Sequence, residues 1–240
     1  MNWLLERADA VEWLEGLSAG SVDLIVTDPA YESLEKHRAK GTTTRLTKAW
    51  FEIFPNARFA ALFAAMHRAL AKNSHLYVIC DETTADVIKP IGRAAGFTFW
   101  KSIVWDKRKI GMGYHYRNRC EFALFFEKGK RKLRDLSVAD VLEGKNVERY
   151  IDAESGPDWL DADGIRGGYP TQKPLELLKT LVLQSSDMGQ LVVDPFAGSA
   201  STGHAAMLLG RRFAGCDVSA DAIELGRRKL EQTPFLTRAA

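Results

Sequence analysis

Cysteine is scarce in this sequence, and the few cysteines stand apart from one another. Among 240 residues there are three, Cys80, Cys120 and Cys216. None belongs to a C-x-x-C pair, and none has a histidine partner at the spacing of a zinc site. These absences argue against a disulfide framework and a structural zinc site, and we expect a reduced, cytoplasmic protein without a metal.

Long hydrophobic runs are also missing. No stretch of the sequence approaches the roughly 18 uninterrupted apolar residues that indicate a membrane-spanning helix. Residues 1–7 have neither a basic lead nor a long apolar stretch. We therefore expect neither a membrane span nor a signal peptide.

Two common phosphate-binding signatures do not occur. The sequence has no G-x-G-x-x-G, which is typical of dinucleotide sites, and no G-x-x-x-x-G-K-[ST], which binds triphosphates. The formal net charge of +2 does not by itself indicate nucleic-acid binding. What is present, 46% hydrophobic residues in 240, is enough for the core of one α/β domain.

The clearest local pattern lies in residues 191–202, which predict a strand, a tight turn and a helix. The strand ends at Asp194 because the proline that follows has no N–H for a β-ladder. Gly198 permits a turn that a side chain would block, and we expect Ser199 to cap the helix. Cofactors bind at such junctions of strand, glycine turn and helix in α/β proteins.

The next predicted strand, residues 212–216, ends in Asp217. A carboxylate at this point is placed to accept hydrogen bonds from ribose hydroxyls. Together the two strand ends favour a nucleoside-type ligand. The alternative is an ordinary strand, turn and helix with an acidic end.

A second strand that ends in an acid and a proline occurs early in the chain. Residues 22–27 form a buried-strand pattern, followed by Asp28, Pro29, Ala30 and Tyr31. A proline turn at a protein surface would explain the first two residues. The aromatic residue directly after the turn indicates a flat ligand.

Four motifs, in their order along the chain, resemble the β group of S-adenosylmethionine-dependent DNA amino-methyltransferases. Residues 28–31 resemble the (D/N/S)-P-P-(Y/F/W) catalytic motif, and residues 194–199 resemble the F-x-G cofactor motif. Residues 169–174, YPTQKP, are similar to the P-T-x-K-P segment, and residues 117–129 are similar to the last strand of the catalytic half. The resemblance covers almost the whole chain.

The resemblance implies a Rossmann-like α/β fold. We expect a seven-stranded, mostly parallel sheet with helices on both faces, in the circularly permuted order of the β group. Residues 1–240 would form a single catalytic domain. The alternation of predicted helices (residues 58–70 and 83–95) with predicted strands (76–80 and 97–105) agrees with parallel strands.

The activity implied is transfer of a methyl group from S-adenosylmethionine to the N6 amine of adenine in DNA. In this reading the Asp28 carboxylate and the Pro29 carbonyl bind the amine, Ala30 completes the turn, and Tyr31 stacks on a base extruded from the duplex. Methylation of cytosine N4 is one alternative, and a DNA-binding protein with little turnover is another. RNA or a protein amide is a third possible acceptor.

The resemblance also implies a cofactor site. Phe196, Ala197, Gly198 and Ser199 would lie beside the methionine part, and Thr171 and Lys173 would hold its carboxylate. Asp217 would take the ribose, and Asp9 would accept from the adenine amino group. Ala10, Asp28 and Ser201 would also bind the cofactor. No metal is implied.

Two residues depart from the family pattern. Ala30 stands where a second proline is usual, which affects the turn that aims the Pro29 carbonyl. Ala200 stands where a glycine often follows the cofactor turn.

Three segments are candidates for DNA contact. We expect a mobile, basic loop over about residues 32–50, a basic loop rich in glycine and tyrosine over residues 106–119, and a small target-recognition segment over about residues 130–168. Residues 121–126 would form an antiparallel strand at the edge of the sheet. A homodimer is plausible from the family resemblance alone.

The predicted strand over 97–105 contains four aromatic residues, and burial at every second position accounts for most of them. We expect them to belong to the core: Phe97, Phe99, Trp100 and Trp105.

Overall fold

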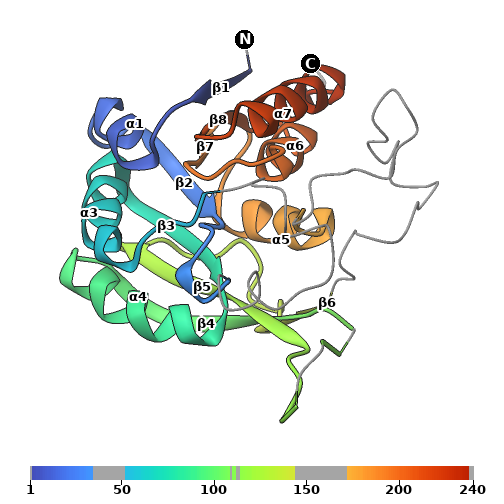
Figure 1. Cartoon of the computed structure of the whole chain (residues 1–240). Coiled ribbons are helices and arrows are strands. Elements are labelled where there is room, and N and C mark those ends of the chain that lie inside the picture. The colour runs from blue at the N-terminus through green and yellow to red at the C-terminus, as the bar shows by residue number, and fades with distance from the viewer. Residues whose placement is uncertain (1, 35–51, 109, 112–113, 144–171, 238–240) are drawn as a thin grey trace.

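A computed structural model of the chain describes residues 2–34, 52–108, 110–111, 114–143 and 172–237. Its strands form one sheet, in the order β1-β8-β7-β2-β3-β5-β4-β6 (Figure 1). They are β1 (Trp3–Arg7), β2 (Val22–Thr27), β3 (Leu70–Cys80), β4 (Thr98–Asp106), β5 (Cys120–Lys128), β6 (Val141–Glu143), β7 (Leu191–Asp194) and β8 (Arg212–Asp217).

The sheet confirms the predicted class of fold. Every neighbouring pair of strands is parallel except the two pairs that contain β5. The prediction of seven strands was wrong by one, because the three-residue strand β6 pairs with the outer side of β4. A strand this short carries too little alternation to be recognised in the sequence.

The predicted edge position of β5 was also wrong. Strand β5 is antiparallel, as expected, but it lies between β3 and β4 and pairs with both. It follows β4 through a hairpin, so it returns along β4 and fills the space between β4 and β3. The inner position provides backbone hydrogen-bond partners on both of its sides.

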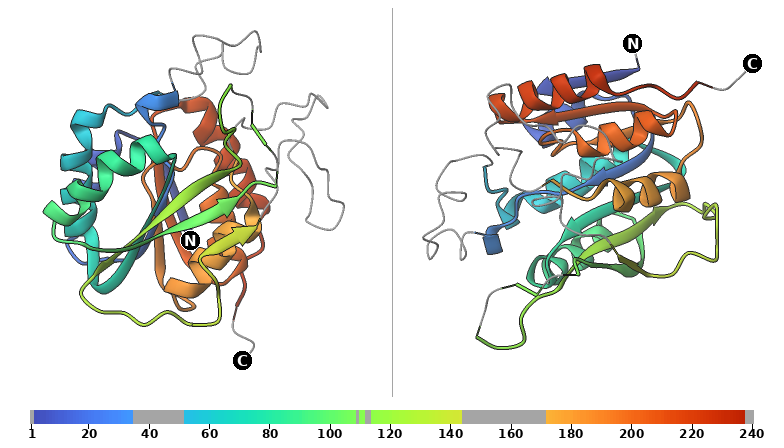
Figure 2. Two further views of the ribbon diagram at one scale, coloured as in Figure 1. Left: turned by 90° about the horizontal axis from the view of Figure 1, so that it is seen from below. Right: turned by 90° about the vertical axis from the view of Figure 1, so that its right-hand side faces the viewer.

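Helices cover both faces of the sheet. Figure 2 shows α1 (Ala10–Gly16), α3 (Phe59–Ala69) and α4 (Glu82–Ala94) on one face. The other face carries α5 (Leu175–Ser185), α6 (Ser201–Leu208) and α7 (Ala220–Gln232). Two short 3-10 helices, η1 (Glu32–Leu34) and η2 (Asn56–Arg58), lie on either side of the first long gap in the described chain.

Each inner strand alternates its side chains between these two helical layers. In β3, Leu76 and Val78 pack in the cluster with α1, α3 and α4, whereas Tyr77 and Ile79 pack in the cluster with α5, α6 and α7. This period of two is the strand pattern expected from the sequence. It gives the sheet two apolar faces and so explains why helices cover both.

The aromatic residues of β4 follow this rule only in part. Trp105 and the preceding Phe97 are buried, and Phe99 is partly buried. Trp100 is 60% exposed, so its predicted place in the core was wrong. Its indole N–H donates to Glu127 Oε2 at 2.8 Å on the neighbouring strand.

The sheet order brings the two acid-proline motifs side by side. Strand β2 pairs in parallel with β7, and β7 pairs in parallel with β8. The residues that follow β2 and end β7 and β8 therefore meet at one edge of the sheet. In the part of the chain that the structure describes, no helix is long and apolar enough to cross a membrane.

Candidate active site

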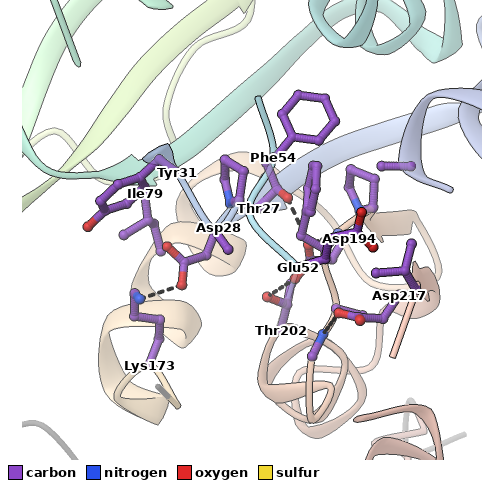
Figure 3. A pocket seen from close by; sticks show the side chains of 18 of the residues that line it. Thr27, Asp28, Tyr31, Glu52, Phe54, Ile79, Lys173, Asp194, Thr202 and Asp217 are labelled. Atoms are coloured by element: carbon purple, nitrogen blue, oxygen red, sulfur yellow. Dashed lines mark hydrogen bonds and ion pairs between the residues drawn. The ribbon is translucent and has the colours of Figure 1, made fainter. Parts of the chain in front are cut away.

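A cleft of about 240 Å³ opens at this edge of the sheet (Figure 3). It is lined by every predicted site residue that the structure describes: Asp9, Ala10, Asp28, Pro29, Ala30, Tyr31, Lys173, Phe196, Ala197, Gly198, Ser199, Ser201 and Asp217. Thr171 lies outside the described residues. So do residues 35–50 of the predicted mobile loop and residues 144–168 of the predicted recognition segment.

Asp28 follows β2 and points into the cleft, where Lys173 donates a hydrogen bond to its Oδ2 (Figure 3). Burial raises the pKa of Asp28, and the nearby Glu121 raises it further, while Lys173 opposes the rise. The carboxyl group is thus a stronger base than an ordinary aspartate, and it has a cation beside it.

Lys173 lies just before α5, and its ammonium group contacts two carboxylates. Besides the bond to Asp28, its Nζ lies 3.8 Å from Glu121 Oε2. Burial lowers the pKa of Lys173, but the carboxylates of Asp28 and Glu121 outweigh burial and the net shift is upward. The structure therefore gives Lys173 a partner in the catalytic motif, and its expected contact with a cofactor carboxylate stays a prediction.

Tyr31 is buried, at 5% exposure, although it lines the cleft. It forms an isolated parallel β-bridge with Phe54, whose N–H donates to the Ala30 carbonyl at 2.7 Å. The ring of Phe54 packs edge-on against Phe196, with centroids 5.1 Å apart. The segment around Phe54 thus joins the predicted catalytic turn (residues 28–31) to the predicted cofactor turn (residues 195–199). The stacking role of Tyr31 stays a prediction.

The turn after β7 is held in place by the Asp194 carboxylate. Thr27 Oγ1 and Thr202 Oγ1 each donate to it at 2.8 Å, and the Phe196 N–H donates at 3.0 Å (Figure 3). Burial raises the pKa of Asp194 to about 7, although these three donors lower it. This one side chain ties the end of β2, the turn and the first residues of α6 together.

The backbone of the turn uses left-handed conformations at two positions. Gly198 has φ 51°, which agrees with the glycine turn predicted there, and Ala200 has φ 59°. The prediction that Ser199 caps the helix was wrong: α6 has Ala200 as its N-cap, with no side-chain cap bond. The hydroxyls of Ser199 and Ser201 instead accept from Lys229 Nζ of α7, at 3.2 Å and 3.4 Å.

Asp217 ends β8 at the other side of the turn. Its Oδ2 accepts from the Gly198 N–H at 2.9 Å, and its Oδ1 accepts from the Ser219 N–H at 2.9 Å. Burial raises the pKa of Asp217, while these N–H groups lower it. Each carboxylate oxygen keeps a second lone pair with which it can accept from a ligand hydroxyl.

Asp9 is the N-cap of α1 and also half of an ion pair. Its carboxylate accepts from the Val11 and Glu12 N–H groups and from both terminal nitrogens of Arg58, at 2.8 Å each. The hydrogen bond from Arg58 lowers the pKa of Asp9 more than burial raises it. The Arg58 guanidinium also lies over the Phe54 ring, 5.0 Å from its centroid, so Arg58 forms part of the cleft wall.

The hairpin between β4 and β5 projects from the body of the protein (Figure 2). Much of its basic charge is paired: Lys107 bonds Glu121, Arg108 bonds Glu143, and Arg119 bonds Asp106 with two nitrogens. Two rings are fully open to solvent, Tyr114 at 96% and Tyr116 at 105% exposure. In its described residues the hairpin therefore presents two exposed aromatic rings and has three basic side chains paired with carboxylates.

Several cleft residues were not predicted from the sequence. Among them are Thr27, Glu52, Phe54, Arg58, Glu121, Asp194 and Thr202. Asp194 and Glu121 stand inside the motifs that carried the resemblance, so their position in the motif was a usable signal. Phe54 and Arg58 reach the cleft only through tertiary packing, for which the sequence has no local signal.

Comparison with known proteins gives a consistent result. Residues 22–228 match the model of a family described as DNA methylase. The chain is 31% identical, over 248 residues, to DNA adenine methyltransferase YhdJ of Escherichia coli strain K12, with 94% of this chain and 81% of that protein covered.

The fold is similar to two solved methyltransferase structures. One is M1.HpyAVI in complex with SAM, with a TM-score of 0.66, 22% identity, and 95% of this chain and 100% of that chain covered. The other is the cytosine-N4-specific PvuII DNA methyltransferase, with a TM-score of 0.74, 16% identity, and 100% and 88% covered. At these identities the likeness shows the fold alone.

Proposed function

Because this chain belongs to the DNA methylase family, as its four motifs predicted, we propose that it methylates the N6 amine of adenine in DNA, with S-adenosylmethionine as methyl donor. The observation that carries the proposal is the Asp28 carboxylate in the same cleft as the cofactor turn, Phe196 to Ser199. The choice of adenine is supported by an aspartate as the first motif residue and by the adenine-specific relative. The fold does not decide between bases, since a cytosine-N4-specific enzyme shares it.

The residues of the cleft fit the proposed cofactor. Phe196 and Phe54 offer apolar walls, and the carboxylates of Asp217 and Asp9 offer acceptors for a ribose hydroxyl and an adenine amine. The acidic Asp28 is suited to lie near a sulfonium cation. When bound, the cofactor supplies an electrophilic methyl group.

The chain's own contribution is to orient the amine and receive its proton. The lone pair of an exocyclic amine is delocalised into the ring, so the amine is a weak nucleophile. Two acceptors, an Asp28 oxygen and the Pro29 carbonyl, would bind its two N–H groups and turn the lone pair toward the methyl carbon. The Asp28 carboxylate, with its raised pKa, is then the nearest base for the proton that the amine loses.

We propose that the base leaves the duplex to reach this site. Asp28 is only partly exposed and has the buried Tyr31 beside it in the cleft. The amine of a paired base cannot approach such an acceptor. Fluorescence of 2-aminopurine at the target position should rise on binding if the base is extruded.

The exposed rings of Tyr114 and Tyr116 support DNA contact by the hairpin. Aromatic side chains stack on bases irrespective of sequence, and Arg117, which is exposed beside them, suits phosphate contact. Replacing both tyrosines by serine should weaken DNA binding and leave cofactor affinity unchanged.

A homodimer is part of the proposal. Exposed apolar residues near the β6 end of the sheet support it: Trp100, Leu136, Val138 and Val141. Light scattering of the purified protein would give twice the monomer mass of 26.8 kDa if the chain dimerises.

The test of function is direct. The protein is incubated with S-adenosylmethionine and with DNA amplified from unmodified nucleotides, and the DNA is digested and analysed by mass spectrometry. We expect N6-methyladenine. N4-methylcytosine would correct the base and keep the mechanism, whereas bound cofactor without a methylated base would refute the proposed activity. The Asp28→Ala variant is the control for a contaminating methyltransferase.

A further inference from the structure

Glu121 is one of several carboxylates that line the cleft, and it lies next to the ammonium group that holds Asp28. It is the second residue of β5 and pairs with Trp105 of β4. Its Oε2 lies 3.8 Å from Lys173 Nζ, while its Oε1 accepts from Lys107 Nζ at 2.5 Å. Its side chain is only 18% exposed.

The ammonium groups of both lysines lie over the buried ring of Trp105. Lys107 Nζ lies 5.5 Å and Lys173 Nζ 5.9 Å from its centroid. A cation over an indole face is stabilised there, so both ammonium groups have a reason to stay near Glu121. Burial raises the pKa of Glu121, but Lys173 and Lys107 outweigh burial, and the net shift is downward.

Lys173 competes with the amine of the base for the Asp28 carboxylate, and Glu121 lies close enough to Lys173 to bind it instead. In the structure the Lys173 ammonium bonds Asp28 Oδ2, so it occupies and partly neutralises the carboxylate that the proposed function assigns to the amine. An acceptor already engaged by a cation binds a neutral N–H less strongly. The ammonium therefore has to leave Asp28 when a base enters, and Glu121 is the other carboxylate that it contacts within the described part of the chain.

We propose that Glu121 is a positioning residue for methyl transfer, which takes the Lys173 ammonium when the amine of the base binds Asp28. This inference rests on the proposed function. Glu121 then bonds one lysine with each oxygen, Lys107 with Oε1 and Lys173 with Oε2. The ammonium needs to move by only about 1 Å to reach hydrogen-bond distance from Oε2.

Several charged or titratable groups influence Asp28, and any test by pH must allow for all of them. They are Lys173 before α5, Glu121 and Lys107 at the β4–β5 hairpin, Asp194 at the end of β7, and Tyr31 and Cys80 near the catalytic turn. Of these, Glu121 adds to the upward effect of burial on the pKa of Asp28. Its removal should lower that pKa.

The experiment compares Glu121→Gln with Glu143→Gln in the full-length protein. Both variants remove one ion pair of the same hairpin, but the Glu143 pair with Arg108 is solvent-exposed and does not line the cleft. Turnover of DNA, calorimetric affinity for S-adenosylmethionine, and the pH profile of turnover are measured for each. Wild-type turnover on the same DNA is measured first, and its absence would refute the proposed function rather than this inference.

We expect Glu121→Gln to lower kcat at least about tenfold, which corresponds to about 1.4 kcal/mol, and to leave cofactor affinity unchanged. The acidic limb of its pH profile should move to lower pH, which a loss of hairpin packing alone would not cause. Glu143→Gln should match the wild type. Wild-type turnover in Glu121→Gln, or equal losses in the two variants, would overturn the inference.

A second variant keeps the test decisive if Glu121→Gln is unstable. Glu121→Asp retains the charge but withdraws it by one methylene from Lys173. We expect kcat to fall, and we expect the acidic limb of the pH profile of turnover to stay at the same pH as in the wild type. A kcat equal to that of the wild type would show that the distance between the two groups is irrelevant, and would contradict the proposed transfer of the ammonium.

Discussion

Asp28 and Asp194 follow the same sequence rule and occupy different environments. Each comes at the end of a buried parallel strand, each is followed by proline, and the two strands, β2 and β7, are neighbours in the sheet. Asp194 is 3% exposed and accepts from three neutral donors. Asp28 opens to the cleft, and its hydrogen-bond partner is the ammonium group of Lys173.

The difference lies in what surrounds each carboxylate. Two hydroxyls and a backbone N–H fix Asp194, and they belong to elements that must stay together, so its role is to join the catalytic turn to the cofactor turn. In the described part of the chain Asp28 is held by one cation, the Lys173 ammonium group, which also lies 3.8 Å from a second carboxylate, Glu121. The carboxylate to which we assign substrate binding therefore differs from the structural one in the kind of donor it meets: an ammonium group for Asp28, two hydroxyls and an N–H group for Asp194.

The largest expected effect is on Asp28. Asp28→Ala should lower kcat by about 1000-fold or more, because an acceptor that orients the amine is lost, while cofactor affinity and thermal stability change little. Turnover is measured by incorporation of labelled methyl groups into DNA. Asp28→Asn, which keeps one carbonyl oxygen, is the matched control and should retain more activity. Turnover of the alanine variant close to wild type would remove Asp28 from the mechanism.

Asp194→Ala should lower the free energy of unfolding, which Asp28→Ala should leave almost unchanged. It leaves the hydroxyls of Thr27 and Thr202 and the Phe196 N–H without their acceptor inside the protein. We expect the free energy of unfolding to fall by about 3 kcal/mol, as measured by urea denaturation. A loss of less than about 1 kcal/mol would mean that water replaces the carboxylate and that Asp194 does not hold the turn.

Asp194 should also make stability depend on pH. Its pKa is near 3.8 when unfolded and about 7 when folded, so the folded protein binds a proton that the unfolded chain has released. The contribution of Asp194 to the free energy of unfolding is therefore complete below about pH 4. It falls as the pH rises to about 7, by up to about 1.4 kcal/mol per pH unit. Asp194→Asn should flatten this part of the profile. Equal slopes in the two proteins, from urea midpoints at pH 5 and pH 7, would contradict the assignment.

Much of this architecture could be predicted from the sequence, because strands with a period of two and Asp-Pro strand ends are local signals. Asp28 and the turn at Gly198 were found in this way. The pairs that give these residues their properties join distant parts of the chain: Lys173 with Asp28 across 145 positions and Thr27 with Asp194 across 167. No local pattern specifies such a partner.

The places where prediction failed have two causes. The three-residue strand β6 has no period to detect, and β5 owes its inner position to its hairpin with β4 and to the free side of β3. Ser199 has the right residue type for a helix cap, but Lys229 of a later helix bonds its hydroxyl. For β5 and Ser199 a tertiary contact decided the outcome over a local preference, whereas β6 carried no local signal.

The smallest expected effect is at Ala200, where the turn after Asp194 departs from the family pattern. Its φ of 59° is left-handed, and it costs an alanine about 1 kcal/mol that a glycine does not lose. Its side chain is fully buried, so Ala200→Gly also loses about 0.8 kcal/mol of apolar burial and gains freedom in the unfolded chain. These terms offset one another, and we expect the free energy of unfolding to change by less than about 1 kcal/mol.

Ala200→Val is the contrasting variant. A β-branched residue is strained at this φ and has Gly226 close by, so valine should destabilise the turn clearly. If valine were tolerated as well as glycine, Asp194 would not hold the turn rigidly. The structural role that distinguishes Asp194 from Asp28 would then be refuted.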